Sequence, residues 1–267
     1  MNELSFVYPN GARKAATLRF DDGPKFDKRM LSLLEKHGMK ATFYLSAGLL
    51  GTGWHVGGDE VKTLYARHEV ANHTLRHIDP RRVALSEDEL RAELSEGKKA
   101  LEALTGKRVE GYAYVCSAFG AVGREAYLRI LGETGHTYAV MGRENECFIP
   151  DLAHRFDLGQ SFRIGSEKVL AAAREFAASE PCELSCFLAM AHTYEFEDDR
   201  FPYGWDRAEA LCEILSGKDD IWYATNGEMF RYLLAVKEYR ESGCAENKTG
   251  QMLYYLKDGA VCALPSL

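Results

Sequence analysis

Short runs of apolar, β-forming residues alternate along most of the chain with stretches whose apolar residues recur at helical spacing. Alternation of this kind is typical of βα units built around a parallel sheet or barrel. We expect about seven or eight such units, with strands at Thr17–Phe20, Ala41–Leu45, Glu69–Ala71, Gly111–Val115, Thr137–Met141, Leu184–Ala191 and Ile221–Ala224.

The helical stretches carry recognisable start and stop signals. Asp27–His37 has apolar residues at helical spacing, and Gly38 is suited to end it in the left-handed conformation. Two capping boxes, in which a Ser or Thr is followed three residues later by a Glu, predict the starts of two longer helices: Ser86 with Glu89, and Thr225 with Glu228.

The end of the chain has a different pattern. Apolar and polar residues alternate on both sides of Asp258-Gly259, which predicts a β-hairpin with a tight turn. With no internal repeat and no Pro/Gly/Ser linker, we expect one barrel domain over residues 1–241 and a small hairpin appendage over residues 242–267.

Composition and net charge limit the classes of molecule that this protein is expected to bind. The chain has 267 residues, 46% hydrophobic and 27% charged, and a net charge of −7. This balance, without a long basic run, argues against binding to nucleic acid or anionic membranes, so we expect a small or neutral partner.

No apolar run reaches 18 residues and the first residues lack the features of a secretory signal, which predicts a cytoplasmic protein. The oligomeric state is not specified.

Seven cysteines are scattered along the chain, and none forms a Cys-x-x-Cys pair. This pattern does not suggest a zinc or redox motif. We expect reduced and mostly buried thiols.

The first candidate for chemistry is the pair Asp21-Asp22, which comes directly after the predicted strand Thr17–Phe20. Loops at the C-terminal ends of parallel strands converge to build sites, and Gly23-Pro24 would hold the two carboxylates at that edge. Asp, Gly and Pro are also ordinary turn residues, so the alternative is a helix cap beside a solvated carboxylate.

The second candidate is the stretch "HEVANHTLRH". His73 and His77 are four residues apart, a spacing that places two imidazoles on one face of a helical turn, where they can bind one metal ion. A pair of surface histidines is the alternative, and His68 could be a solvated residue at a strand edge. Two histidines with a carboxylate leave positions open for water and substrate, as catalytic metal sites require.

The third candidate is "LSCFLAMAHTYEFEDD", where His192, Tyr194 and Glu195 follow a strongly apolar strand. A lone histidine there is more often a hydrogen-bonded structural residue. In this chain it would supply the third titrating group that a hydrolytic mechanism needs.

Together, "FDDGP" at 20–24, "HTLRH" at 73–77 and the histidine at 192 resemble the successive motifs of the polysaccharide deacetylases, also called NodB-homology carbohydrate esterases. The resemblance runs from about Thr17 to Leu234. It implies a distorted (β/α) barrel of about seven parallel strands, which agrees with the unit count above.

The resemblance also implies roles for the motif residues. Asp21 would be the general base and His192 the general acid, and Asp22, His73 and His77 would hold a divalent metal ion. These ligands suit zinc best, although cobalt, nickel, iron and manganese fit the same set.

Two motifs depart from the family pattern. Where most members have Arg-x-Pro-Phe/Tyr-Gly, this chain reads "GYAYVCSAFG", without the Arg that orients the base. Arg163 is the first candidate to replace it, and Arg19, inside the first strand, is a weaker one. The acid histidine likewise lacks an obvious partner, for which Asp157 and Glu195 are candidates. For each of Asp157, Arg163 and Glu195, a structural or solvated charge without a role in the site is the alternative.

The predicted reaction is metal-assisted hydrolysis of an N- or O-linked acetyl group on a sugar. Phe119, in the altered loop, and Tyr194 are the expected substrate or oxyanion contacts, with a backbone N–H of the "SAFG" loop as oxyanion donor. Two alternatives stay open: a metal-dependent amidase acting on a small cyclic or linear amide, and a carbohydrate-binding relative without activity.

Overall fold

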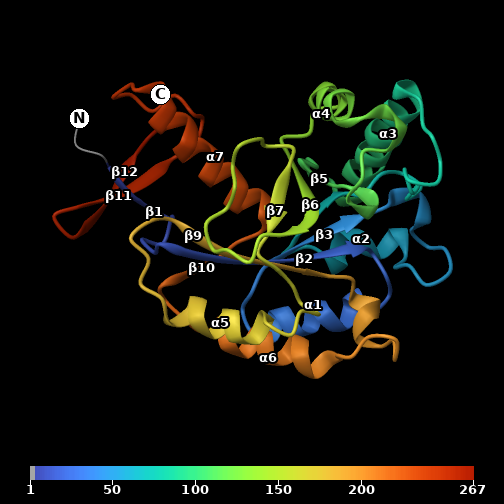
Figure 1. Ribbon diagram of the computed structural model, residues 1–267, viewed down its shortest axis with the longest axis horizontal. Helices are drawn as coiled ribbons and strands as arrows, with labels where there is room; N and C mark the ends of the chain where they lie inside the picture. The colour runs from blue at the N-terminus through green and yellow to red at the C-terminus, as the bar shows by residue number, and fades with distance from the viewer. Residues whose placement is uncertain (1–3) are drawn as a thin grey trace.

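A parallel sheet occupies the centre of the molecule, and helices cover its outer faces (Figure 1). The computed structural model describes residues 4–267. Its helices are α1 (Asp27–Lys36), α2 (Val61–Leu64), α3 (Glu87–Thr105), α4 (Arg124–Glu133), α5 (Val169–Ala178), α6 (Trp205–Leu215) and α7 (Asn226–Ser242). Its strands are β1 (Ser5–Val7), β2 (Lys14–Asp22), β3 (Ala41–Leu45), β4 (Glu69–Asn72), β5 (Gly111–Ala113), β6 (Tyr138–Glu144), β7 (Leu158–Gln160), β8 (Phe162–Arg163), β9 (Ser185–Ala191), β10 (Ile221–Tyr223), β11 (Leu253–Lys257) and β12 (Ala260–Leu264).

The main sheet closes on itself. Its strands run parallel in the order β7-β6-β5-β4-β3-β2-β9-β8, with β10 also paired to β2. β7 and β8 are separated only by Ser161, and they pair with β6 on one side and β9 on the other. The segment 158–163 is therefore the seam of a (β/α) barrel, and the predicted fold class is confirmed.

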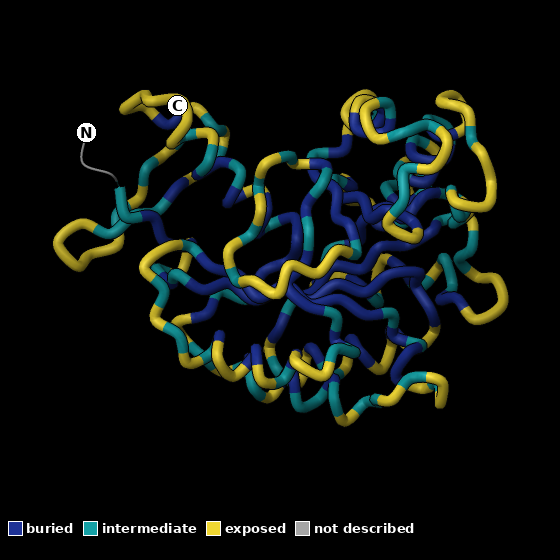
Figure 2. Tube along the Cα trace, in the orientation of Figure 1, coloured by how far each residue is buried: buried dark blue, intermediate teal, exposed yellow. Residues whose placement is uncertain are grey.

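The helices form layers around this barrel, with α1, α5 and α6 packed together on one side and α3 against α4 on another (Figure 1). The strands at the centre are almost continuously buried, whereas the outer surfaces of the helices are exposed (Figure 2). Both predicted capping boxes are present: the Ser86 and Thr225 side chains accept hydrogen bonds from the backbone N–H groups of Glu89 and Glu228.

The predicted strands were found, with one consequential difference in β2. This strand extends from Lys14 to Asp22 and all nine of its residues are buried. Asp21 and Asp22 are therefore its last two residues rather than the first residues of a following loop. The pattern of apolar residues missed this because β2 buries charged side chains at both ends.

The predicted C-terminal hairpin is also present. Asp258 and Gly259 both have positive φ, at 52° and 79°, as a two-residue type I′ turn requires. β11 of this hairpin pairs with β1 from the other end of the chain, which makes a separate three-stranded sheet beside α7 (Figure 1). The division of the chain into domains at residues 241 and 242 stays a prediction.

The prediction of mostly buried cysteines is wrong. Only Cys186 and Cys212 are buried, and all seven thiols are free. Most of the others lie in loops or on the edge of the small sheet, where no core is available to cover them. Among residues 4–267, no helix is long and apolar enough to cross a membrane.

Candidate active site at the C-terminal ends of the strands

The three predicted metal ligands meet at the C-terminal ends of neighbouring strands. Asp22 ends β2, His73 follows β4, and His77 lies on the loop after it; their ligand atoms are all within 4.8 Å of one another. Asp22 Oδ1 lies 3.0 Å from His77 Nε2 and 3.4 Å from His73 Nε2. Because β2, β3 and β4 are parallel neighbours, groups far apart in sequence share this edge.

The two histidines do not sit on a helical turn, as their spacing predicted. Residues 73–77 form a loop, in which Thr74 and His77 have positive φ. The buried Glu93 side chain of α3 pins this loop by accepting hydrogen bonds from the backbone N–H groups of Leu75 and Arg76. The imidazoles are thus brought together by a carboxylate from a neighbouring helix rather than by helical periodicity.

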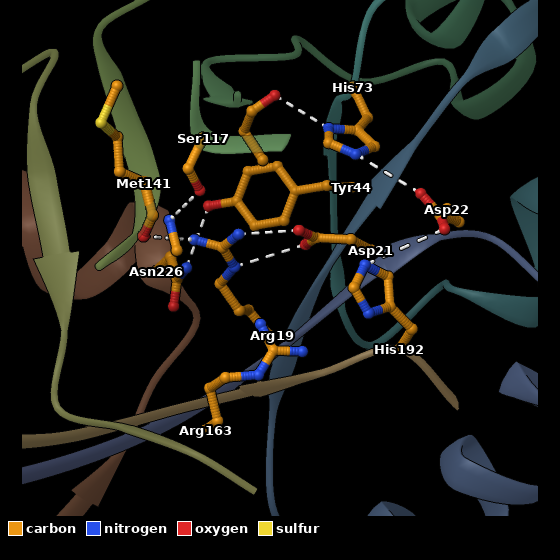
Figure 3. Close-up of polar contacts among 12 residues, drawn as sticks. Arg19, Asp21, Asp22, Tyr44, His73, Ser117, Met141, Arg163, His192 and Asn226 are labelled. Atoms are coloured by element: carbon orange, nitrogen blue, oxygen red, sulfur yellow. Dashed lines mark hydrogen bonds and ion pairs between the residues drawn. The ribbon is translucent and has the colours of Figure 1, made fainter. Parts of the chain in front are cut away.

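The donor set fits a divalent cation. His73 Nδ1 lies 2.8 Å from the carbonyl oxygen of Ala113, so Nδ1–H donates to it and the Nε2 lone pair faces Asp22 (Figure 3). Asp22 Oδ1 is buried and, although both rings approach it, it meets no donor in hydrogen-bonding geometry among the described residues. A metal ion between this lone pair of His73 and the buried carboxylate would supply the positive charge that both groups favour. The neighbouring histidines also hold the pKa of Asp22 far below its ordinary value, against the effect of burial.

Arg19, the weaker of the two candidates predicted from the sequence, holds Asp21. Arg19 Nη2 donates to Asp21 Oδ2 over 2.7 Å and Arg19 Nε to Oδ1 over 3.3 Å (Figure 3). Both side chains are almost fully buried, at 1% and 2% exposed. Burial raises the pKa of Asp21, but Arg19 and the nearby imidazoles more than offset this and lower it below its ordinary value. Two residues apart on one strand, Arg19 and Asp21 point to the same face, a signal that the sequence contained.

Arg163 does not contact Asp21. Its guanidinium lies 2.9 Å from Glu195 Oε1, so it belongs to the surroundings of His192 instead. β8, which carries Arg163, pairs with β9, the strand that leads to His192. Arg163 was predicted to contact Asp21 in place of the missing arginine, and this contact is made by Arg19 instead.

His192, which follows β9, is oriented by Glu195. His192 Nδ1 lies 2.8 Å from Glu195 Oε1, and Tyr203 donates to the other carboxylate oxygen over 2.7 Å. His192 Nε2 is left facing the site, 3.9 Å from Asp22 Oδ2. Burial lowers the pKa of His192, but the hydrogen bond to Glu195 and the nearby aspartates raise it above its ordinary value.

Asp157, the other candidate partner of His192, is engaged elsewhere. Its carboxylate pairs with Arg124 over 2.9 Å and with Arg143 over 2.7 Å. A structural role away from His192 is therefore what the contacts of Asp157 show, whereas Glu195 contacts His192 directly.

The two predicted substrate contacts differ in position. Tyr194 stacks on His192, with ring centroids 5.1 Å apart. The Phe119 ring instead packs against Tyr114 and Tyr127 in a cluster between α3 and α4, so only the backbone of its loop is free for a role at the site.

An exposed tryptophan extends the site outward and was missed in the sequence. Trp54 is 43% exposed and meets Tyr194 edge to face, with centroids 5.2 Å apart. Its loop is fastened beside the aspartates, because the carbonyl oxygen of Trp54 accepts a hydrogen bond from Lys25. A tryptophan in the glycine-rich stretch "LGTGWHVGG" after a strand was the available signal.

Comparison with known proteins agrees with this geometry. The polysaccharide deacetylase family model matches residues 9–139. A peptidoglycan-N-acetylglucosamine deacetylase of Bacillus cereus is 35% identical over 110 residues, which are 40% of this chain and 38% of that protein. The chain thus matches well under half the length of this curated relative.

Solved structures share the fold. A structure from Mycobacterium smegmatis assigned to the polysaccharide deacetylases superposes with a TM-score of 0.60 at 19% identity, covering 89% of this chain and 96% of that one. A family 4 carbohydrate esterase from Streptomyces lividans, solved with acetate, gives 0.53 at 14% identity over 82% and 95%. The segment that matches the polysaccharide deacetylase family model, residues 9–139, carries both aspartates and both histidines of the cluster, so the chain is similar to this family in the part that holds most of the candidate site.

Proposed function

We propose that this protein is a metal-dependent hydrolase that removes acetyl groups from a carbohydrate. One observation carries the proposal. Asp21 and His192 both lie beside the cluster of Asp22, His73 and His77, and each is held by its own oppositely charged or hydrogen-bonded partner. A base and an acid around a metal site form the arrangement that hydrolysis of an amide or ester requires.

The proposed ligands of the metal ion are Asp22, His73 and His77, with zinc the best match to this donor set. When bound, a divalent cation supplies Lewis acidity: it polarises a carbonyl oxygen and makes water a stronger acid. The side chains of the protein provide the remaining chemistry.

Asp21 acts as the general base. Arg19 keeps its carboxylate ionised and fixes its plane, so that it takes a proton from the attacking water as the new C–O bond forms. A backbone N–H of the loop at residues 117–120 would stabilise the negative charge that develops on the acetyl oxygen.

His192 acts as the general acid. Its Nδ1–H is held by Glu195, and its Nε2–H donates a proton to the leaving atom as the C–N or C–O bond breaks. The products are acetate and a free amine or hydroxyl. Amines leave poorly without protonation, so a histidine whose pKa is raised by Glu195 favours the N-linked acetyl group.

The surroundings favour an extended substrate over a small amide. An open hollow of about 690 Å³ adjoins Arg163 and Tyr203, the side chains that support Glu195. Its size is in the range of ligand sites. The aromatic rings of Phe201 and Tyr203 can stack on a sugar ring, and the carboxylates of Glu144 and Glu146 can accept hydrogen bonds from its hydroxyl groups.

Acetate release from three substrates tests the proposal: an N-acetylglucosamine oligomer, an O-acetylated xylooligosaccharide and a small acetylated aryl amide. Release from the oligomer that stops on chelation and returns with zinc is the expected result. Hydrolysis of the small amide alone would instead identify an amidase. Bound metal without acetate release from any of them would identify a binding protein.

Two variants separate the neighbouring aspartates. Asp22→Ala is expected to lose metal and activity together, whereas Asp21→Asn is expected to keep the metal and lose roughly 10²–10⁴-fold in turnover. Full activity in either variant would overturn the assignment.

A further inference from the structure

A second cavity lies at the opposite end of β4 from the catalytic groups. It has a volume of about 390 Å³ and lies between α2, the start of β4, the segment after α3 and the first turns of α7. Six side-chain cations and three glutamates line it, a balance of +3 with His68 neutral, although the whole chain carries −7. The cations are Lys40, Lys62, Arg67, Lys107, Arg108 and Arg231.

Half of these cations are not neutralised. Among residues 4–267, Lys62 and Arg67 form no ion pair, and the Lys107 ammonium donates only to the carbonyl oxygen of Ala66 over 2.9 Å. The other three pair with glutamates of the same wall: Lys40 with Glu228, and Arg108 and Arg231 with Glu110. The cavity therefore presents positive charge that the protein itself does not balance.

A buried donor in the cavity wall also lacks an acceptor. His68 is only 6% exposed, which contradicts the prediction of a solvated histidine at a strand edge. The backbone N–H of Ala41 donates to His68 Nδ1 over 3.2 Å, so the ring proton resides on Nε2. This Nε2–H has no partner among the described residues. Burial and the neighbouring Arg67 and Lys40 lower the pKa of His68 to about 4, in keeping with a neutral ring.

We propose that this cavity binds a phosphoryl anion, as inorganic phosphate, pyrophosphate or a phosphate ester. Arg67 offers a planar fork for two oxygens, and Lys62 and Lys107 add point charges. The N-terminus of α7 is not the binding group, because the carboxylate of Glu69 already accepts the Gly227 N–H there. The site is separate from the deacetylase chemistry and does not depend on it.

Calorimetric titration of the intact protein with orthophosphate, pyrophosphate and a hexose 6-phosphate tests this inference. Saturable binding is expected, tightest for the ligand with most charge and weaker as salt rises. The preferred ligand distinguishes a free polyphosphate from a phosphate ester. Binding must persist in Asp22→Ala, which excludes coordination to a metal ion in the catalytic site.

Charge reversal locates the site. The double variant Lys62→Glu/Arg67→Glu is expected to weaken binding by roughly tenfold or more. The matched control is Lys99→Glu/Arg174→Glu, which makes the same change in net charge at exposed positions on α3 and α5. Equal weakening in both double variants would show a general charge effect and overturn the proposal, as would the absence of saturable binding in the unmodified protein.

Nitrogen NMR of the histidine rings gives a second, independent readout. Addition of the preferred phosphate is expected to shift the Nε2–H signal of His68 but not the ring signals of His136. Both ring nitrogens of His136 already have hydrogen-bond partners inside the fold. Unchanged His68 signals at saturating ligand would contradict the assignment.

Discussion

Arg19 and Asp21 form a buried ion pair inside the first long strand of the barrel. Burying such a pair removes both charged groups from water, which costs free energy. Removing one member costs more, because the other is left as an unpaired buried charge. Arg19 is also held by the carbonyl oxygen of Met141 over 3.2 Å and lies over the ring of Tyr44. These contacts fix the guanidinium, and through it the carboxylate that we propose as the base.

Replacement of Arg19 by Met is expected to lower acetate release by roughly 10²-fold or more and the free energy of unfolding by about 3–5 kcal/mol, because Asp21 is left charged and buried. The double variant Arg19→Met/Asp21→Asn should regain stability but not activity. Urea denaturation and acetate release measure the two effects. Asp157→Asn is the control for activity, since Asp157 pairs with Arg124 and Arg143; a comparable loss there would contradict the local role of Arg19.

Asp27, at the start of α1, is a fully buried carboxyl beneath the site. It accepts hydrogen bonds from Thr193 over 2.6 Å and from Tyr65 over 2.7 Å. Burial raises the pKa of Asp27 to about 7, with a further contribution from Asp22 and Asp21. The folded protein therefore holds a proton here that the unfolded chain releases near pH 4.

This proton predicts a dependence of stability on pH. The contribution of Asp27 is fully present below about pH 4 and is lost as pH rises through about 7, at up to roughly 1.4 kcal/mol per pH unit. Asp27→Asn should remove that slope, so that the difference in unfolding free energy between the two proteins changes between pH 5 and 8. Urea denaturation at each pH measures it. A constant difference over this range would show that Asp27 is ionised in the folded protein.

At the scale of elements, the first turn of α7 packs against the start of β4. A Cβ added at Gly227 would overlap Glu69 Oε1, and the Glu69 carboxylate already accepts hydrogen bonds from the Gly227 N–H and the Thr42 hydroxyl. Alanine normally stabilises a helix relative to glycine by about 0.5–1 kcal/mol. At this position the buried Glu69 carboxylate leaves no room for the methyl group, so alanine is expected to lower the stability instead of raising it.

Gly227→Ala is therefore expected to destabilise the protein, by about 1–3 kcal/mol as for other overpacked sites. Gly132→Ala in α4 is the matched control, because its nearest neighbour atom is 3.7 Å away and the usual helical gain applies. Thermal unfolding of both variants measures the contrast. Stabilisation by Gly227→Ala would show that Glu69 can move aside.

The sequence predicted elements better than it predicted contacts. Periodicity and caps located the longer strands and three of the helices, α1, α3 and α7, since these depend on local apolar patterns. It did not reveal β7 and β8, which are three and two residues long and include polar residues. For the site, motif spacing brought out Asp22, His73, His77 and His192, whereas the partners Arg19 and Glu195 depend on which strands and turns become neighbours in the barrel.

At the scale of the whole molecule, a metal ion would link segments that the chain itself does not connect closely. Asp22 ends β2, while His73 and His77 belong to the loop that follows β4. An ion bound only by the folded state stabilises it by about 2.7 kcal/mol at a free concentration 100 times its Kd.

Zinc is accordingly expected to raise the melting temperature, and a chelator to lower it. Asp22→Asn should melt at the same temperature with and without zinc. Calorimetry of the metal-free and metal-loaded forms checks this. A zinc response that survives in Asp22→Asn would place the ion elsewhere.

The pairing of β2 with β9 has a consequence for synthesis on the ribosome. Lys14 pairs with Ser185, so one edge of β2 finds its partner only about 170 residues later. At 5–20 residues per second, the nascent chain carries this unpaired edge for roughly 10–30 s. The buried charges Lys14 and Arg19 on that strand would oppose pairing with another chain during this interval, as charges on exposed strand edges commonly do. The same arginine that we propose to orient the base would then also protect the barrel before it closes.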